Sequence, residues 1–141
     1  MIVQFLLALS AVLVTRSVHF YALRSVAAWL RAKDANDFPA YLTILVTGTL
    51  GQCLAAFVFA LAYLASSELG LGTLEAKEPL DLGQVFAFSL VNLTTLGLGD
   101  VIPSGDLKVL AGIEAMTGFL LISCTASHVF QVMKNDLPNS N

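Results

Sequence analysis

Two threonines followed by glycines that alternate with leucines are the residues of this chain whose types and spacing could bind an ion. The stretch covers residues 94–100 and reads TTLGLGD. Carbonyl oxygens replace the water shell of a cation only where the backbone turns several of them toward one axis. Glycine permits such turns, because a positive φ that a Cβ would penalise costs it little. The spacing predicts a backbone cation site, although a Gly-x-Gly pair alone is common in loops.

The composition places this stretch in a membrane protein. The 141 residues are 57% hydrophobic and 12% charged, whereas soluble domains are about 25% charged. Seven Lys and Arg residues against ten Asp and Glu residues give a formal net charge of −3. A basic field for nucleic acid is therefore absent, and no nucleic-acid partner is expected.

Two apolar segments flank the stretch and are long enough to cross a bilayer. Residues 41–65 contain no charged side chain, and a helix of this length covers about 30 Å of hydrocarbon. Residues 107–133 carry only Lys108, at the start, and Glu114 as charged side chains. We expect both segments to be membrane-spanning helices.

A shorter helix is predicted directly before the glycines, over residues 82–94. Asp81 and Gln84 have the spacing of a capping box at its start. About 12 residues make only about 18 Å of helix, which is too short to cross. The chain must then enter and return, and irregular backbone at membrane depth needs protein or water around it. The unsatisfied carbonyls at the helix end are expected to point toward the membrane centre and to favour a cation there.

Residues 41–133 resemble the pore module of the two-transmembrane bacterial potassium-channel family. The resemblance rests on Thr-x-Gly-x-Gly-Asp at residues 95–100 and on Pro103 shortly after it. It implies an all-α membrane protein whose parts are an outer helix (41–65), a re-entrant pore helix (82–94), a selectivity filter (95–100) and an inner helix (107–133), with an additional N-terminal helix (1–32). It further implies a homotetramer, multi-pass in the bacterial plasma (inner) membrane among lipids, that passes monovalent cations. Potassium would be the permeant ion, with no cofactor.

The resemblance also assigns roles within the filter by position. Potassium would be coordinated by one side chain and several carbonyls: Thr95 with both groups, and the carbonyls of Leu96, Gly97 and Leu98. Gly99 would close the mouth, and Asp100 would lie behind it.

Leu98 departs from the family, which usually has an aromatic residue between the two glycines. Leucine supplies the same carbonyl but no ring hydroxyl, so the bracing of the filter from behind is weakened. We predict a potassium-permeable channel with looser discrimination between ions. A weakly selective cation channel and a non-conducting membrane subunit remain as alternatives.

Glu114 is costly within a membrane unless it is neutral, paired or near water. It could brace the pore helix through hydroxyls such as those of Ser89 or Thr94, or pair with Lys108 or Arg16. We favour a supporting role for Glu114 over direct ion binding.

Two further residues of the inner helix carry open alternatives. Gly118 is a candidate hinge, yet glycine also lets membrane helices pack closely. His128 could sense cytoplasmic pH, but a lone histidine near a helix end is more often an interfacial anchor.

The N-terminal helix, residues 1–32, is apolar in its first half. In its second half, four basic or titratable residues fall within an arc of about 140° on a helical wheel: Arg16, His19, Arg24 and Arg31. The helix is transmembrane or interfacial, and we favour spanning. Because acidic residues dominate between residues 66 and 106, the positive-inside rule puts the filter mouth outside the cell.

The other function classes have little support in the sequence. It contains no H-E-x-x-H, no G-x-S-x-G and no phosphate-binding glycine loop followed by Lys, so an enzyme is not expected. It shows no internal repeat of the kind that secondary transporters use. It also has no arginine ladder, which leaves the gating stimulus open.

Overall fold

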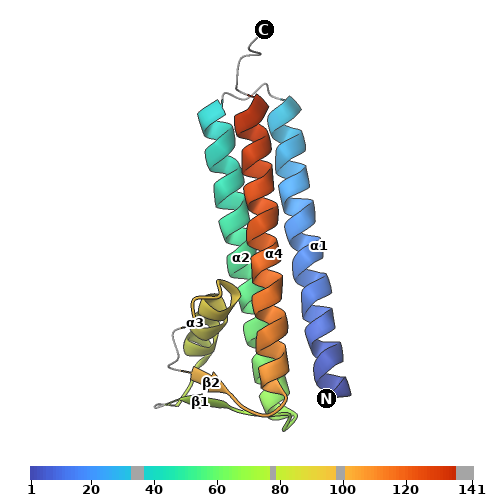
Figure 1. The fold of residues 1–141 in the computed structure, drawn as a ribbon, viewed down its shortest axis with the longest axis vertical. Helices are drawn as coiled ribbons and strands as arrows, with labels where there is room; N and C mark the ends of the chain where they lie inside the picture. The colour runs from blue at the N-terminus through green and yellow to red at the C-terminus, as the bar shows by residue number, and fades with distance from the viewer. Residues whose placement is uncertain (33–36, 77–78, 98–100, 136–141) are drawn as a thin grey trace.

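Three long helices run side by side in the computed structural model, with a short helix and two short strands at one end (Figure 1). The structure describes residues 1–32, 37–76, 79–97 and 101–135. The elements are α1 (Ile2–Ala32), α2 (Asp37–Glu68), β1 (Leu74–Ala76), α3 (Leu82–Leu93), β2 (Val101–Pro103) and α4 (Leu107–Asn135). The predicted fold class, an all-α channel-like membrane protein with an additional N-terminal helix, is confirmed.

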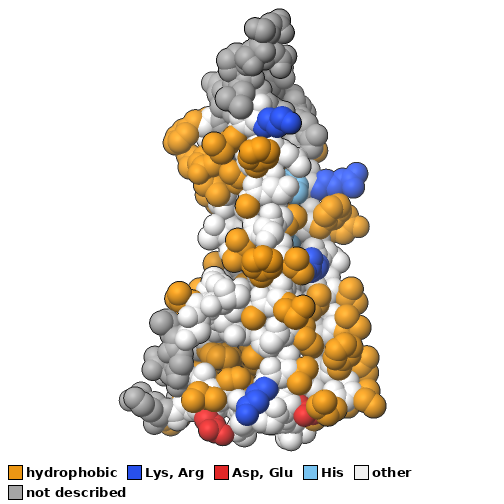
Figure 2. Space-filling view, viewed as in Figure 1, with side chains coloured by type: hydrophobic (Ala, Val, Ile, Leu, Met, Phe, Trp, Pro, Cys, Tyr) orange, Lys and Arg blue, Asp and Glu red, His pale blue; other side chains and the backbone are white. Residues whose placement is uncertain are grey.

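The three long helices each contain a segment apolar and long enough to cross a membrane. These segments are Ile2–Leu30, Phe38–Glu68 and Leu107–Gln131. Orange apolar side chains cover much of the visible surface along the bundle, and the acidic side chains of described residues that are coloured on this face lie at the end that carries the strands (Figure 2). An apolar exterior of this kind is suited to lipid rather than to water.

The helices extend past the uncharged segments from which the sequence predicted them. The helix expected at 41–65 runs over Asp37–Glu68, and the one expected at 107–133 runs over Leu107–Asn135. A charge-free run measures only the hydrocarbon core, whereas helical hydrogen bonding continues through polar residues into the interfacial region.

One buried core lies where α3 packs against α2 and α4, and a second lies between α1 and α2. The first contains Phe59 and Tyr63 of α2, Val85 and Leu93 of α3, and Leu110 of α4. The buried residues of α3 are spaced at every fourth position, which puts one face of this helix against the long helices.

The arc of α1 that carries Arg16, His19, Arg24 and Arg31 is not exposed throughout. Arg24 is exposed, but His19 is 2% exposed and its Nε2 lies 3.1 Å from Thr125 Oγ1 of α4. An arc of about 140° is wide enough for one edge to fall on the contact face of the helix. Gly51 of α2 makes the space, because a Cβ there would touch the His19 ring.

The two strands join the loop after α2 to the segment that precedes α4. They are antiparallel, with Glu75 opposite Ile102 at the centre. Next to them, the Ser104 amide donates to the Thr73 carbonyl over 2.8 Å. The sequence analysis predicted neither strand, because three-residue strands carry little periodic signal.

Candidate functional site

The start of α3 is fixed by the predicted capping box. The Gln84 amide donates to Asp81 Oδ1 over 2.7 Å, and the Asp81 amide donates to Gln84 Oε1 over 2.9 Å. The helix ends at Leu93 with Thr94 as its C-cap. This end lies one residue before the predicted one.

The end of α3 lies about halfway along the bundle (Figure 1). A Cβ built at Gly118 of α4 would overlap the Leu93 carbonyl. Gly118 is roughly 17 Å along the axis from Leu107, where α4 begins. The short helix therefore enters the apolar bundle from one end and stops near its middle.

The same contact bears on the two alternatives for Gly118. Close approach of α3 supports the packing alternative, and α4 is a continuous helix through this residue. A hinge at Gly118 stays a prediction.

The last turn of α3 is capped by the residues that follow it. The Thr95 amide donates to the Asn92 carbonyl over 2.9 Å, and the Leu96 amide donates to the Val91 carbonyl over 3.1 Å. With a positive φ of 61° at Thr95, these two bonds form a Schellman motif. The expectation that the carbonyls at this helix end are unsatisfied is therefore wrong for Val91 and Asn92, because the turn folds its own amides back onto them.

The end of α2 offers a direct comparison. It has the same two bonds, from the Gly70 amide to Ser67 and from the Leu71 amide to Ser66, with φ 68° at Gly70. Glycine is the usual residue at this position, whereas a β-branched residue there is a genuine outlier. Strain of this kind costs on the order of 1–3 kcal/mol and clusters at functional sites. Thr95 therefore adopts a backbone conformation that glycine would adopt with less strain.

The capping bonds also set the direction of two carbonyls. A trans peptide points its C=O away from its N–H. Because the amides of Thr95 and Leu96 point back at α3, the carbonyls of Thr94 and Thr95 point beyond the helix end. This is the direction in which carbonyls could meet an ion near the centre of the membrane.

Gly97 continues this arrangement. Its φ is 63°, as the glycine pattern predicts, so residues 95 and 97 are both left-handed. The sign of φ alternates over residues 95–97, and such alternation gathers amides on one side of the backbone and leaves the carbonyls on the other. The expected filter residues Leu98, Gly99 and Asp100 lie outside the described residues.

The turn is open to the outside of a single chain. Residues 94–97 are exposed, Leu96 by 66%. Apart from Gly97 itself and its two neighbours in the sequence, no described atom lies within 4 Å of a Cβ built at Gly97.

Behind the turn, Glu114 of α4 is completely buried and binds to α3. Its Oε1 contacts Ser89 Oγ, as expected. Its Oε2 accepts hydrogen bonds from the Tyr63 hydroxyl and from Asn92 Nδ2, each over 2.7 Å. Tyr63 and Asn92 are functional candidates that the sequence reasoning missed. Asn92 follows Ser89 by three residues and so shares its helix face, which is the signal that could have found it.

The other expected partners of Glu114 are not used. Thr94 Oγ1 donates instead to the Val91 carbonyl over 2.9 Å, within its own helix. Lys108 is exposed, and among the residues that the structure describes neither it nor Arg16 forms an ion pair with Glu114. Glu114 is therefore held by neutral groups.

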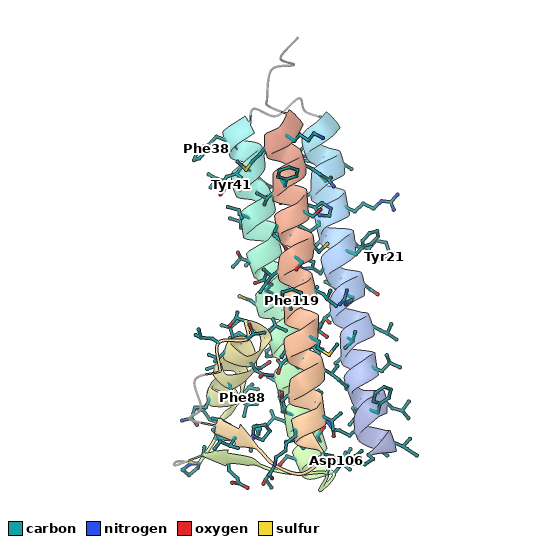
Figure 3. The ribbon with its side chains drawn as sticks, viewed as in Figure 1. Tyr21, Phe38, Tyr41, Phe88, Asp106 and Phe119 are labelled. Carbon is teal, nitrogen blue, oxygen red and sulfur yellow. The ribbon has the colours of Figure 1, made fainter. Side chains whose placement is uncertain are left out.

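The phenylalanines of α3 pack on α2. Phe88 meets Tyr63 edge to face with ring centroids 5.2 Å apart, and Phe86 meets Phe57 at 6.3 Å. Figure 3 shows Phe88 on α3, beside the long helices. Tyr63 thus contacts both the carboxyl and an aromatic ring of this short helix.

The half of α4 beyond Gly118 separates its polar side chains between two faces. Ser123 and Ser127 are exposed, whereas Thr125 is buried against α1. His128 is half-buried, with Nδ1 3.0 Å from the Cys124 carbonyl of the same helix. Its suggested role as a pH sensor stays a prediction.

Comparisons with known proteins agree with this geometry. The model of a family described as "Ion channel" matches residues 42–135, which include α3 and the turn after it. The inward rectifier potassium channel Kirbac3.1 of Paramagnetospirillum magnetotacticum is 33% identical over 95 residues. The matched part is 67% of this chain and 30% of that relative, so the chain spans less than a third of its length. No solved structure matches the chain.

Proposed function

The chain belongs to this ion channel family, and on that premise we propose that it conducts potassium ions passively through a pore lined by residues 95–98. The observation that carries the proposal is the left-handed pair Thr95 and Gly97 at the end of a helix that stops halfway through an apolar bundle. Carbonyls turned to one side of such a backbone can replace the water around a cation. Family membership points to a channel rather than to an enzyme.

We propose that four copies assemble around one axis as a homotetramer. A dehydrated cation needs oxygen atoms on several sides, and one chain offers a single exposed turn. The exposed surface of α4 adds to this argument, because Met116 and Phe119 are 68% and 62% exposed close to the level of that turn. The assembly would be multi-pass in a bacterial plasma membrane.

Within each turn, potassium would bind the Thr95 hydroxyl and the carbonyls of residues 95–98. Gly99 and Asp100 would support the mouth. Glu114 would support the turn from behind, since its three hydrogen-bond partners include Ser89 and Asn92 of α3.

The mouth would face outward. The two strands, with Glu75 on β1, and the start of α4 lie at one end of the bundle, and the Met1 amino group contacts Asp106 there. Lys134 lies near the opposite end of α4, and Arg24 lies on the second half of α1. The positive-inside rule puts that second end in the cytoplasm.

Potassium flux into liposomes that contain the purified protein tests the proposal. Gly97→Ala should abolish flux, because an L-residue is strained at φ 63°. Gly112→Ala is the control, since it makes the same chemical change in α4 where no described atom lies within 4 Å of the added Cβ. Flux that survives Gly97→Ala undiminished would contradict the proposed pore, and a stable, flux-free dimer would support a non-conducting membrane subunit.

A second candidate is a weakly selective cation channel. Leu98, where the family usually has an aromatic residue, is the observation that favours it. Reversal potentials measured with potassium on one side and sodium on the other separate the two candidates.

A further inference from the structure

Ser89 on α3 lies between two oxygen atoms that belong to different helices. Its Oγ is 2.7 Å from the Ala56 carbonyl of α2 and also contacts Glu114 Oε1 of α4. A carbonyl can only accept, and a serine hydroxyl has one proton to donate. If that proton goes to Ala56, the contact with Glu114 is a hydrogen bond only when the carboxyl group supplies a proton of its own.

The other oxygen of Glu114 completes the same pattern. Oε2 accepts from Tyr63 and from Asn92 Nδ2, and the second Asn92 proton is available for the Ala111 carbonyl at 3.0 Å. A neutral carboxylic acid has one donor and a carbonyl that accepts two bonds. In the neutral form, each of the contacts that Glu114 makes with Ser89, Tyr63 and Asn92 is a hydrogen bond with one donated proton.

The surroundings favour the neutral form for a separate reason. Glu114 is 0% exposed, and no described basic side chain lies within ion-pair distance of it. An unpaired carboxylate at membrane depth is costly, because neither water nor a cation offsets the loss of its hydration.

We infer that Glu114 is held as a neutral carboxylic acid whose proton is donated to Ser89, so that it acts as a positioning residue tying α3 to α2 and α4. Ser89 and Asn92 lie in the last turns of α3, and the Asn92 carbonyl also accepts the Thr95 amide. Glu114 is thus linked through Asn92 to the turn that sets the direction of the Thr95 carbonyl. The effect of Glu114 on ion flow rests on the proposed function, whereas the inferred protonation state of Glu114 does not.

Glu114→Gln tests the inference, because an amide reproduces the neutral acid. Its NH₂ can donate to Ser89, and its carbonyl can accept from Tyr63 and Asn92. Glutamine does not imitate an ionised carboxylate, because a carboxylate accepts hydrogen bonds but cannot donate one. Glu114→Ala removes both the donor and the acceptor of this carboxyl group and leaves Tyr63, Ser89 and Asn92 without this partner.

Infrared spectroscopy of the reconstituted protein at neutral pH reads the proton directly. We expect the carbonyl stretch of a protonated carboxylic acid in the wild-type protein, lost in Glu114→Gln and kept in Glu68→Gln, which changes an exposed carboxyl at the end of α2. If Glu114→Gln does not fold, Tyr63→Phe serves instead, because loss of a donor to Oε2 should move the band to higher frequency. Absence of the band from the wild-type protein, or its persistence in Glu114→Gln, would overturn the inference.

Flux measurements keep this result separate from the proposed function. We expect Glu114→Gln to keep the wild-type ratio of potassium to sodium permeability, and Glu114→Ala to reduce that ratio severalfold. A conducting protein without the band contradicts the inference alone. A protein with the band but without flux contradicts the channel proposal alone.

Discussion

The Leu93 carbonyl of α3 packs directly against Gly118 of α4, at the place where any side chain on α4 would occupy the same space. This contact sets how closely the short helix approaches the inner helix. It also sets how far the short helix reaches into the membrane. Because Gly118 has no side chain, α3 can approach α4 closely, and this helps to position the turn at residues 94–97.

Gly118→Ala should therefore push α3 away from α4. The added Cβ meets backbone, which cannot rotate aside, and overpacking of this kind typically costs about 1–3 kcal/mol. We expect a lower unfolding temperature in detergent and lost flux in liposomes, with Gly112→Ala as the unaffected control. Normal stability with an altered open probability would instead support a hinge at Gly118.

Thr95→Gly should separate stability from ion binding. Glycine relieves the strain of φ 61°, which predicts a gain of about 1–2 kcal/mol in the free energy of unfolding. The same change removes the hydroxyl proposed to bind potassium, so permeability should fall. Thr95→Ser, which keeps the hydroxyl, should conserve more of it.

The matched control for Thr95 is the reverse substitution at the other helix end. Gly70→Thr introduces a β-branched residue at φ 68°, in the same capping motif. It should lower stability by an amount similar to that gained by Thr95→Gly. Equal stability of wild type and Thr95→Gly would argue against strain at the filter turn.

Leu98→Tyr should raise discrimination against sodium. A tyrosine restores the ring hydroxyl that a leucine cannot supply, while the backbone carbonyl is the same. The measurement is the shift of the reversal potential when sodium replaces potassium on one side. An identical shift in the wild type and Leu98→Tyr would mean that the leucine does not loosen the filter.

The pair His19 and Thr125 should contribute to the attachment of α1 to α4. The two side chains are buried with His19 Nε2 3.1 Å from Thr125 Oγ1. Polar pairs between membrane helices contribute about 0.6 kcal/mol on average. A double-mutant cycle with His19→Leu and Thr125→Val, read by thermal unfolding, should give a coupling of about that size.

Arg24→Ala is the control for this cycle, because Arg24 is exposed on the same helix. It should couple to Thr125→Val by less than the error of the measurement. Additive effects of His19→Leu and Thr125→Val would show that the contact contributes nothing to attachment.

Local patterns in the sequence predicted the features that depend only on residues close together in the chain, such as helix capping and backbone conformation. The capping box of Asp81 and Gln84 and the positive φ at Gly97 follow from residue types at fixed spacing. The Schellman motif did not follow, since threonine is a poor residue for its left-handed position. Tyr63 was missed as a partner of Glu114 because 51 residues separate them.

By itself, the sequence determined an apolar chain with three long helices, one helix too short to cross, and a threonine-glycine turn after it. These properties come from hydrophobicity, length and backbone preference, which act within a few residues. Only the tertiary structure decided the depth of α3, the partners of Glu114 and the burial of His19. Each of these depends on which faces of separate helices meet, and such contacts are fixed by packing rather than by local pattern.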